Sequence, residues 1–489
     1  MFRTCLKRQA YLRALLVAVL LGTACQPDQP PSPQPDGTPA SSLPASTAPE
    51  PTIPEPTPES GLIRYVAPDG SDDGPGTSSA PWATLQHAAD AARPGISILV
   101  RAGSYAGFAM GVSGTLDAPI MFMAESNERP VIQQPGRRYL VDLSGVHDVI
   151  LTGFDIRDAT EHEGAGVYVS GSSARIEVEG NRIAGNRSFG ILIENSRHVS
   201  VRGNDISGSA SGVRTRGRVP GTLIVDNDIH DNDEMIVNDP EPDNDTGGQG
   251  IAISLSTGPI SIRGNELWGN RAESFDYGHD GSAFEVFGSS KILITHNVVW
   301  DNETVMETGT NLTSQCVDIR FTHNVAFART SSGESKGILL RCAQRSLVAH
   351  NTLYGMEEWV LQFRNREGVG FAGSIDHLTV VNNILSGEIA FYVLDPLPSS
   401  AVVDYNLVDA DRGVLGRTGG EELHDLAALR SVLGIQEFGR HARLHLADPE
   451  GGDVRPLPAS PAIDAGIRLR RVNDGFAASA PDIGRYEVR

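Results

Sequence analysis

The sequence has little cysteine, little lysine and no apolar run long enough to span a membrane. Its 489 residues include four cysteines, two of them within the first 25 residues, which excludes a disulfide-rich scaffold. The apolar run 14–21 is shorter than the roughly 20 residues that a spanning helix needs. Basic residues number 40 against 61 acidic ones, for a formal net charge of −21. This excess opposes binding to nucleic acid and to anionic lipid, so we expect neither as a partner.

The first 24 residues have the features of an export signal. Four basic residues precede the apolar run 14–21, and small residues follow it at 22–24, which predicts a signal peptide over 1–24 and an exported protein. Cys25 directly after these small residues resembles the lipidated cysteine of a bacterial lipobox. That resemblance implies a cell-envelope lipoprotein, at the outer membrane or the cell surface. Gly22 stands where the motif usually has Leu, so secretion without a lipid is the alternative.

Residues 25–60 change composition to Pro, Ser, Thr, Asp and Glu, with few large apolar side chains. Such a segment cannot bury enough surface to offset the entropy lost on ordering, so we expect a disordered tether. A lipid on Cys25 would then be the protein's one attachment to a membrane.

A repeated unit dominates the rest of the chain, which is too long for one compact core. The unit is a short β-branched strand that ends at an asparagine, as in IEVEGN at 176–181. Successive asparagines are 23, 23, 38, 32, 27, 27, 32 and 23 residues apart. A second short strand lies within each period, which is typical of one coil of a parallel β-helix. We interpret the asparagines as a structural ladder inside the turns rather than a catalytic row: Asn181, Asn204, Asn227, Asn265, Asn297, Asn324, Asn351, Asn383 and Asn406.

Both ends of the repeat are expected to carry caps, because a solenoid must shield its terminal core. At the front, residues 81–92 form the pattern of an amphipathic helix, and we place the N-terminal cap at 61–105. The predicted β-helix covers 106–415. A C-terminal cap segment with a short helix at 424–433 is predicted within 416–489.

The opening and closing segments resemble those of bacterial right-handed parallel β-helix proteins of the pectate-lyase-like superfamily. The similar motifs are YVAPDGSD at 65–72, PWATLQ at 81–86, AARPG at 91–95, GSY at 103–105, SPAIDAG at 460–466 and DIG at 482–484. The resemblance covers residues 61–489 and implies an all-β, right-handed parallel β-helix with an N-terminal helical cap. The superfamily contains polysaccharide lyases, hydrolases, epimerases and members without known activity, so the fold alone does not choose among them.

The two longest insertions lie on adjacent coils, and the first of them is rich in carboxylates. Residues 231–245 contain seven acidic side chains, interspersed with Asn and backbone carbonyls, which are the hard oxygen ligands that Ca²⁺ prefers. We take Ca²⁺ as the candidate cofactor, and a solvated acidic loop as the alternative. The candidate ligands are Asp231, Asp233, Glu234, Asp239, Asp243 and Asp245.

Strand alternation predicts which side chains leave the core beside these loops. Glu285 and Glu307 are expected to point outward and, if the strands share one sheet, to continue in a row with Arg341 and Arg364. With Asp280 in the next loop, such a row could bind a sugar chain. Ordinary solvation of a charged sheet face is the alternative.

Elimination from a uronate needs a base for the proton next to the carboxylate and a positive charge to neutralise the enolate that develops. After residue 24 the chain has two lysines, Lys291 and Lys336, and Lys336 precedes the strand that ends at Arg341. Residues 335–341 loosely resemble the arginine-bearing coil of the alginate-lyase and chondroitinase family. That family has His-Gly where this chain has Cys342-Ala343, and its lysine lies one coil earlier, where 305–309 has none.

His279 is a third catalytic candidate. Residues 275–280 are similar to the Asp-Pro-His-Asp motif of mannuronan epimerases, although the proline is missing and one residue is inserted. A histidine titrates near neutral pH and suits acid–base chemistry. The alternative is a loop histidine that bonds to Asp276 or Asp280.

Cys316 and Cys342 lie 8 and 9 residues before repeat asparagines, which places them on neighbouring coils. That separation permits a disulfide in an oxidising compartment.

The sequence therefore predicts an exported, monomeric β-helix that acts on or binds an extracellular, acidic polysaccharide. A Ca²⁺-dependent uronate lyase, with Lys336 or His279 as base and Arg341 neutralising the substrate, is the enzyme hypothesis. A non-catalytic carbohydrate-binding or adhesion protein and a uronan C5-epimerase are the alternatives.

Overall fold

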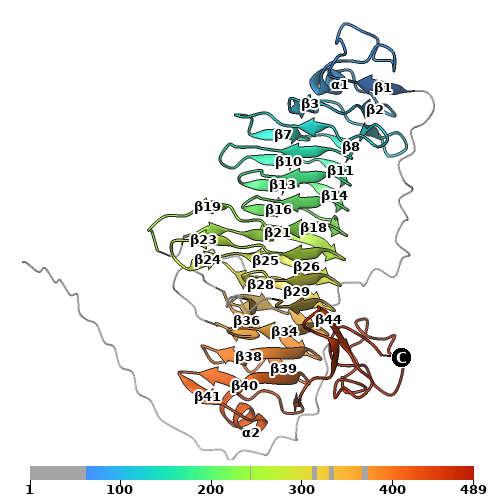
Figure 1. Ribbon diagram of the computed structural model, residues 1–489. Coiled ribbons are helices and arrows are strands. Elements are labelled where there is room, and N and C mark those ends of the chain that lie inside the picture. Colours follow the sequence, from blue (N-terminus) through green and yellow to red (C-terminus); the bar gives the residue numbers. More distant parts are fainter. Residues whose placement is uncertain (1–61, 243, 311–315, 330–334, 366–372, 489) are drawn as a thin grey trace, which may run out of the picture. The chain divides into compact units, whose positions relative to one another are not determined.

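The computed structural model describes residues 62–488 apart from 243, 311–315, 330–334 and 366–372. The predicted signal peptide at 1–24, Cys25 and the tether therefore lie outside the described residues. In the described part, 38 strands form one continuous sheet, and almost all neighbouring strands are parallel (Figure 1). No helix of this part has both the length and the apolar character to cross a membrane.

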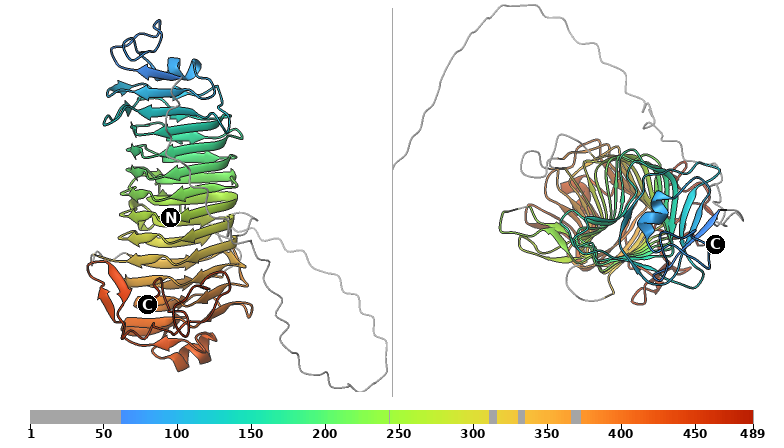
Figure 2. Two further views of the ribbon diagram at one scale, coloured as in Figure 1. Left: turned by 90° about the vertical axis from the view of Figure 1, so that its right-hand side faces the viewer. Right: turned by 90° about the horizontal axis from the view of Figure 1, so that it is seen from above.

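Each coil contributes three short strands separated by turns. In one coil these are β10 (Ala165–Val169), β11 (Ala174–Glu179) and β12 (Arg182–Ala184). Each pairs in parallel with its counterpart one coil later, which is β13 (Phe189–Glu194), β14 (Arg197–Arg202) or β15 (Asp205–Ser207). Successive coils therefore superpose along the axis (Figure 2). The predicted right-handed parallel β-helix is confirmed.

The strands that occupy the β10 position form what we call the first face of the solenoid. Its strands after β13 are β16 (Ser211–Arg218), β21 (Gln249–Arg263), β25 (Ser282–Phe287), β28 (Thr304–Gly309), β31 (Lys336–Leu340), β35 (Leu361–Phe363), β38 (Ile384–Val393) and β40 (Leu407–Thr418). The strands β21, β38 and β40 are long because each continues around a corner into a neighbouring face.

The core consists of like residues stacked on successive coils. On the first face Ile191, Val213, Ile251 and Phe284 follow one another in register, and each is 0% exposed. Burying an aliphatic or aromatic side chain of this size contributes about 1.5–3 kcal/mol. The alternating pattern of the sequence therefore fixes which side chains on each strand point outward.

The asparagine ladder forms inside one turn. The side-chain amide of Asn204 donates to Asn227 Oδ1 at 2.9 Å, and that of Asn227 donates to Asn265 Oδ1 at 2.9 Å. Each amide also bonds a backbone carbonyl of the preceding coil, as Asn204 does with Val178 at 2.9 Å. The ladder satisfies buried turn groups, so its role is structural, as predicted.

A helix caps the N-terminal end. It is α1 (Leu85–Asp90), shorter than the predicted 81–92. The Thr84 side chain accepts a hydrogen bond from the His87 backbone N–H at 3.1 Å and so caps the start of the helix at Leu85. At the other end the predicted helix at 424–433 consists of α2 (Leu426–Ala428) and the π-helical turn η1 (Leu429–Leu433). The C-terminal segment then packs back on the solenoid, with Leu446 and Val454 against Val325 and Phe327.

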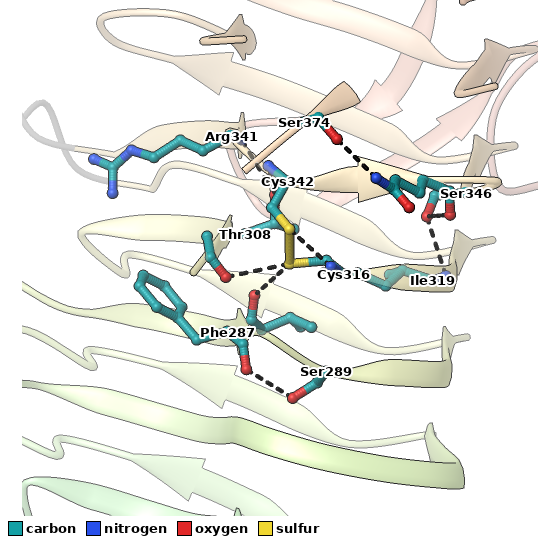
Figure 3. The surroundings of a disulfide bond; sticks show 12 residues. Phe287, Ser289, Thr308, Cys316, Ile319, Arg341, Cys342, Ser346 and Ser374 are labelled. Atoms are coloured by element: carbon teal, nitrogen blue, oxygen red, sulfur yellow. Dashed lines mark hydrogen bonds between the residues drawn. A yellow bond between two sulfur atoms is a disulfide. The ribbon is translucent and has the colours of Figure 1, made fainter. Parts of the chain in front are cut away.

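A disulfide joins Cys316 to Cys342 across neighbouring coils, with a Cα–Cα distance of 5.3 Å (Figure 3). Both cysteines are 0% exposed. The Arg341 side chain, one residue before Cys342, points away from the disulfide (Figure 3). The bond therefore anchors the end of β31 while Arg341 remains directed to the outer surface.

A polar cleft on the first face

A cleft of about 900 Å³ lies on the outer side of the first face. Two antiparallel hairpins contribute lining residues to the cleft. One pairs β19 (Met235–Val237) with β20 (Thr246–Gly247), and the other pairs β23 (Ala272–Ser274) with β24 (Gly278–Asp280). The two long insertions identified in the sequence therefore fold as antiparallel hairpins beside the sheet (Figure 1). Seven of the predicted site residues line this one cleft: Asp245, His279, Asp280, Glu285, Glu307, Lys336 and Arg341.

One outward row of side chains forms the floor. Register places Arg214 beside Ala252, then Glu285, Glu307, Leu339 and Gln362 on successive strands. The predicted neighbours Glu285 and Glu307 are adjacent. The predicted continuation through Arg341 and Arg364 is wrong, because Met306 pairs with Ile338 and thereby sets Leu339 opposite Glu307. Arg364 does not line the cleft, whereas Arg341 reaches it from the end of the strand.

Lys336 is held by a carboxylate that the sequence analysis missed. Its Nζ lies 2.7 Å from Glu303 Oε1, and Glu303 is 4% exposed. Arg271 Nη2 lies 3.9 Å from the other oxygen of Glu303. Glu303 directly follows Asn302, which belongs to a second asparagine ladder with Asn270. That second ladder is the sequence signal that could have located Glu303.

Arg341 forms an ion pair with Glu307 across the same two coils. The side chains are 18% and 21% exposed, so both remain accessible from the cleft. A guanidinium has five N–H donors, so Arg341 can hold Glu307 and still bind a second carboxylate.

Two carboxyl groups in the cleft have raised pKa values and so keep their protons to a higher pH than usual. Burial, together with the charge of Glu307, raises the pKa of Glu285 to about 7, although Arg214 opposes the shift. Burial and the neighbouring Glu285 and Glu307 raise the pKa of Asp280 well above its usual range. Carboxyl groups with raised pKa values in a cleft are candidate proton donors near neutral pH.

Polar side chains that the sequence analysis did not identify support Glu285. Gln249, which is 1% exposed, donates its amide N–H to Glu285 Oε2 and accepts from Ser211 Oγ at 2.6 Å. Arg214 donates to Ser254 Oγ at 3.0 Å, and burial lowers the pKa of its guanidinium. These partners lie on coils separated by long insertions, so their sequence spacing gave no signal.

His279 lies in β24, opposite Glu273 in the hairpin. The neighbouring Asp276 accepts from the backbone N–H of Asn244 at 3.1 Å and so ties the two hairpins together. His279 therefore lies at the cleft on a hairpin that is held in place by its hydrogen bond to the other hairpin.

The predicted calcium ligands that the structure describes do not form one cluster. Asp245 lines the cleft, but its oxygens accept from Ser274 Oγ at 2.8 Å and from the Asp276 and Asp239 backbone N–H groups. Asp231 instead bonds His230, with its Oδ2 3.0 Å from Nδ1. The cleft lining does not include the other predicted ligands that the structure describes, Asp233, Glu234 and Asp239, and Asp243 lies outside the described residues.

Across the described part of the chain, no group of three or more His, Cys, Asp or Glu side chains is arranged to hold a metal ion. Within the cleft, Glu285 and Glu307 are instead engaged by Gln249 and Arg341. The carboxylates as arranged here therefore do not fit Ca²⁺, and the predicted calcium set is not supported.

Comparison with known proteins places the chain in a family. Residues 64–356 match the family described as Pel9A-like, right-handed β-helix region. The uncharacterized protein YwoF of Bacillus subtilis is 35% identical over 137 residues, which are 26% of this chain and 29% of YwoF. Pectate lyase PEL9 of Emericella nidulans is 41% identical over 71 residues, 14% of this chain and 17% of that protein. The chain thus matches less than a third of the length of either relative.

Solved structures share the fold at low sequence identity. The complex of XylC with xylose superposes with a TM-score of 0.54 at 12% identity, over 79% of this chain and 87% of XylC. Pectate lyase Pel9A gives a TM-score of 0.45 at 18% identity, over 88% of this chain and 98% of Pel9A. The match over 64–356 and the observed coils lead to one conclusion: the chain belongs to the Pel9A-like right-handed β-helix family.

Proposed function

We propose that this protein is a polysaccharide lyase that cleaves an acidic polysaccharide in the first-face cleft. The observation that carries the proposal is the meeting of two cations, Lys336 and Arg341, with two carboxyl groups of raised pKa, Asp280 and Glu285, in one cleft. Family membership supports a carbohydrate substrate, since the matched relative from Emericella nidulans is named a pectate lyase.

The arginines of the cleft suit a uronate. Arg214 lies in the same row as Glu285 and Glu307, Arg341 reaches the row from the end of its strand, and both arginines line the cleft. A guanidinium binds a carboxylate through two parallel hydrogen bonds, which fixes the sugar ring as well as its charge. The same positive charge stabilises the enolate that forms when the neighbouring proton leaves.

In this mechanism Lys336 is the base. Its contact with Glu303, at 2.7 Å, holds Nζ at the edge of the cleft, and Nζ acts as the base after it has lost its proton to water. The amine takes the proton at C5 of the uronate, the C–H electron pair forms the C4–C5 double bond, and the bond from C4 to the bridging oxygen breaks. The protonated carboxyl of Glu285 gives its proton to that oxygen. Water later restores the proton of Glu285.

A binding protein without turnover is the second candidate. The specific observation in its favour is that Glu303 and Glu307 already engage both Lys336 and Arg341. An epimerase would remove the same proton and return one from the other face, with His279 available in the cleft as a second acid.

Export and lipid attachment are also part of the proposal. The signal pattern at 1–24 and Cys25 support an envelope lipoprotein whose cleft faces polysaccharide outside the cell. Replacement of Cys25 by Ala should release the protein from the membrane fraction, whereas an unchanged distribution would contradict lipidation.

The test is absorbance at 235 nm, which detects the unsaturated product. The full chain, purified in mild detergent, is incubated with polygalacturonate, alginate and chondroitin. We expect a rise on at least one polymer and a loss of about a hundredfold or more in Lys336→Met. Lys291→Met is the matched control, because Lys291 is exposed on the strand Ser290–Thr295, outside the cleft, and should retain full activity. No rise on any polymer would favour the binding protein.

A further inference from the structure

Six successive strands of the first face, from β7 (Tyr139–Asp142) to β25, lead into the same kind of corner. The corner residue lies three positions after a row of paired residues, namely Asp142, Tyr168, Leu192, Arg214, Ala252 and Glu285. All six corner residues have a positive φ, between 44° and 75°: Gly145, Gly171, Asn195, Gly217, Leu255 and Gly288. Glycine adopts this left-handed conformation freely and asparagine tolerates it, so five of the six residues suit the turn.

Leu255 does not suit the corner that it occupies. With a φ of 51°, its Cβ comes too close to the following carbonyl oxygen, which destabilises the fold. Its side chain is 47% exposed, so burial of apolar surface does not offset that strain. Strained residues of this kind persist mostly at functional sites, which makes Leu255 a candidate for a role in binding.

The strand that carries Leu255 also has a bulge at this point. Arg216 pairs with Ser254 and Gly217 pairs with Ser256, so Leu255 is an extra residue between two paired ones. A bulge bends its strand and redirects the side chain, and bulges are common beside active sites. The bulge therefore accounts for the outward direction of Leu255.

Leu255 lines the first-face cleft. Tyr277, which is 46% exposed, lines the same cleft from the hairpin of β23 and β24. The C–H groups of a sugar ring form an apolar surface that packs against aliphatic and aromatic side chains. The cations of the cleft bind a carboxylate but cannot supply this apolar contact, whereas Leu255 can.

We propose that Leu255 is a substrate-binding residue that packs against the apolar C–H surface of a sugar ring in the cleft. This inference rests on the proposed function and deepens it, because it assigns part of the affinity to the ring itself rather than to its charge. Arg214 and Arg341 bind the carboxylate, and Leu255 fixes the orientation of the ring. The strain at the corner is then the cost of placing an apolar side chain at the cleft.

The test compares the binding of full-length proteins to polygalacturonate, alginate and chondroitin by affinity gel electrophoresis. All the proteins carry Lys336→Met, so that elimination does not consume the polymer. We expect at least one polymer to bind, and Leu255→Gly to weaken that binding tenfold or more. Leu255→Met keeps an apolar side chain of similar volume and should bind as tightly as the protein with Leu255.

Asn195→Gly is the matched control for the change to glycine. Asn195 occupies the corner two strands earlier, is exposed and does not line the cleft, so this variant should bind the polymer unchanged. Urea denaturation separates binding from folding. Glycine suits a left-handed corner, so the urea midpoint of Leu255→Gly should equal or exceed that of the protein with Leu255.

Three results would overturn the inference. The first is that none of the three polymers binds, and the second is that Leu255→Gly binds as tightly as the protein with Leu255. The third is a lower urea midpoint for Leu255→Gly, which would show that Leu255 serves the fold. Failure of the proposed function appears separately, as absence of Lys336-dependent absorbance at 235 nm while Leu255-dependent binding remains.

Discussion

Lys336 and Glu303 form an ion pair across two neighbouring coils, with Nζ 2.7 Å from Oε1 and side chains that are 25% and 5% exposed. The buried carboxylate fixes the ammonium at the edge of the cleft, while the lysine remains accessible to a ligand. Parallel stacking makes this possible, since Thr304, the residue after Glu303, pairs directly with Lys336.

Glu303→Ala should lower kcat about a hundredfold and leave KM nearly unchanged, because Nζ of Lys336 is no longer held at its place in the cleft. Glu303→Gln keeps the shape and a hydrogen-bond acceptor for Lys336, so it should retain more activity than Glu303→Ala. Steady-state kinetics on the polymer that gives the strongest absorbance rise will measure this split. A rise in KM with unchanged kcat would show that Glu303 only positions substrate.

Activity should fall as pH rises above about 7. The pKa of Glu285 is raised to about 7, mainly by burial, so its carboxyl keeps the proton that the leaving oxygen needs until that pH and loses it above. Glu285→Gln should reduce turnover strongly and remove the alkaline limb of the pH profile. Glu266→Gln, at an exposed position outside the cleft, should retain both activity and profile. An alkaline limb that persists in Glu285→Gln would assign the proton donor elsewhere.

Chelation should leave the activity unchanged. In the described residues no three carboxylate or histidine side chains are arranged around a common metal position, and Arg341 with Arg214 supplies the positive charge for the substrate. The measurement is the initial rate with EDTA and after readdition of Ca²⁺. A rate that falls with EDTA and returns with Ca²⁺ would contradict this account of the cleft.

A histidine stack should make the fold sensitive to acid. His296, His323 and His350 stack with ring centres 5.1 and 5.0 Å apart, beneath the C-terminal segment, whose Gly484 carbonyl lies 3.3 Å from His350 Nδ1. Burial lowers their pKa values to about 4, 3 and 4, respectively. The unfolded chain therefore binds protons first as pH falls from about 6.5 towards 4, and stability is lost in that window.

For His350, which is 3% exposed, a shift from 6.5 to about 4 corresponds to about 3 kcal/mol. Glu285 acts in the opposite direction, because its raised pKa favours folding at low pH, so the comparison must be between variants. His350→Gln should flatten the fall in unfolding free energy between pH 6.5 and 4, measured by urea denaturation. His445→Gln, at an exposed position, should follow the wild type. Parallel curves for His350→Gln and the wild type would disprove the effect.

The fold was predictable because every coil repeats the same contacts, so the same residue pattern recurs many times along the sequence. The asparagines mark the same turn on successive coils, and their observed ladder, as from Asn204 to Asn227, follows the intervals directly. The outward direction of Glu285 and Glu307 follows from the buried residues on either side of them. Lys336 and Arg341 could be chosen because lysine is rare and because the insertions indicate where a cleft forms.

The remaining site residues depend on register and loop geometry, which the sequence does not encode locally. Arg364 was misplaced because the pairing of Leu339 with Gln362 is set by inward neighbours on both strands. The carboxylate of Asp245 seemed suited to a cation, yet it is used to brace the hairpins through Ser274. Arg214 lies before the 38-residue interval between Asn227 and Asn265, and Gln249 lies within it, so no motif connects either residue to Glu285.

The central claim is that the cleft breaks a uronate chain by elimination, and product analysis in water enriched in heavy oxygen tests it most directly. Elimination adds no water, so the account predicts unsaturated oligosaccharides without heavy oxygen at the new ends, and their loss in Lys336→Met. Saturated products that carry heavy oxygen would show hydrolysis and contradict the claim.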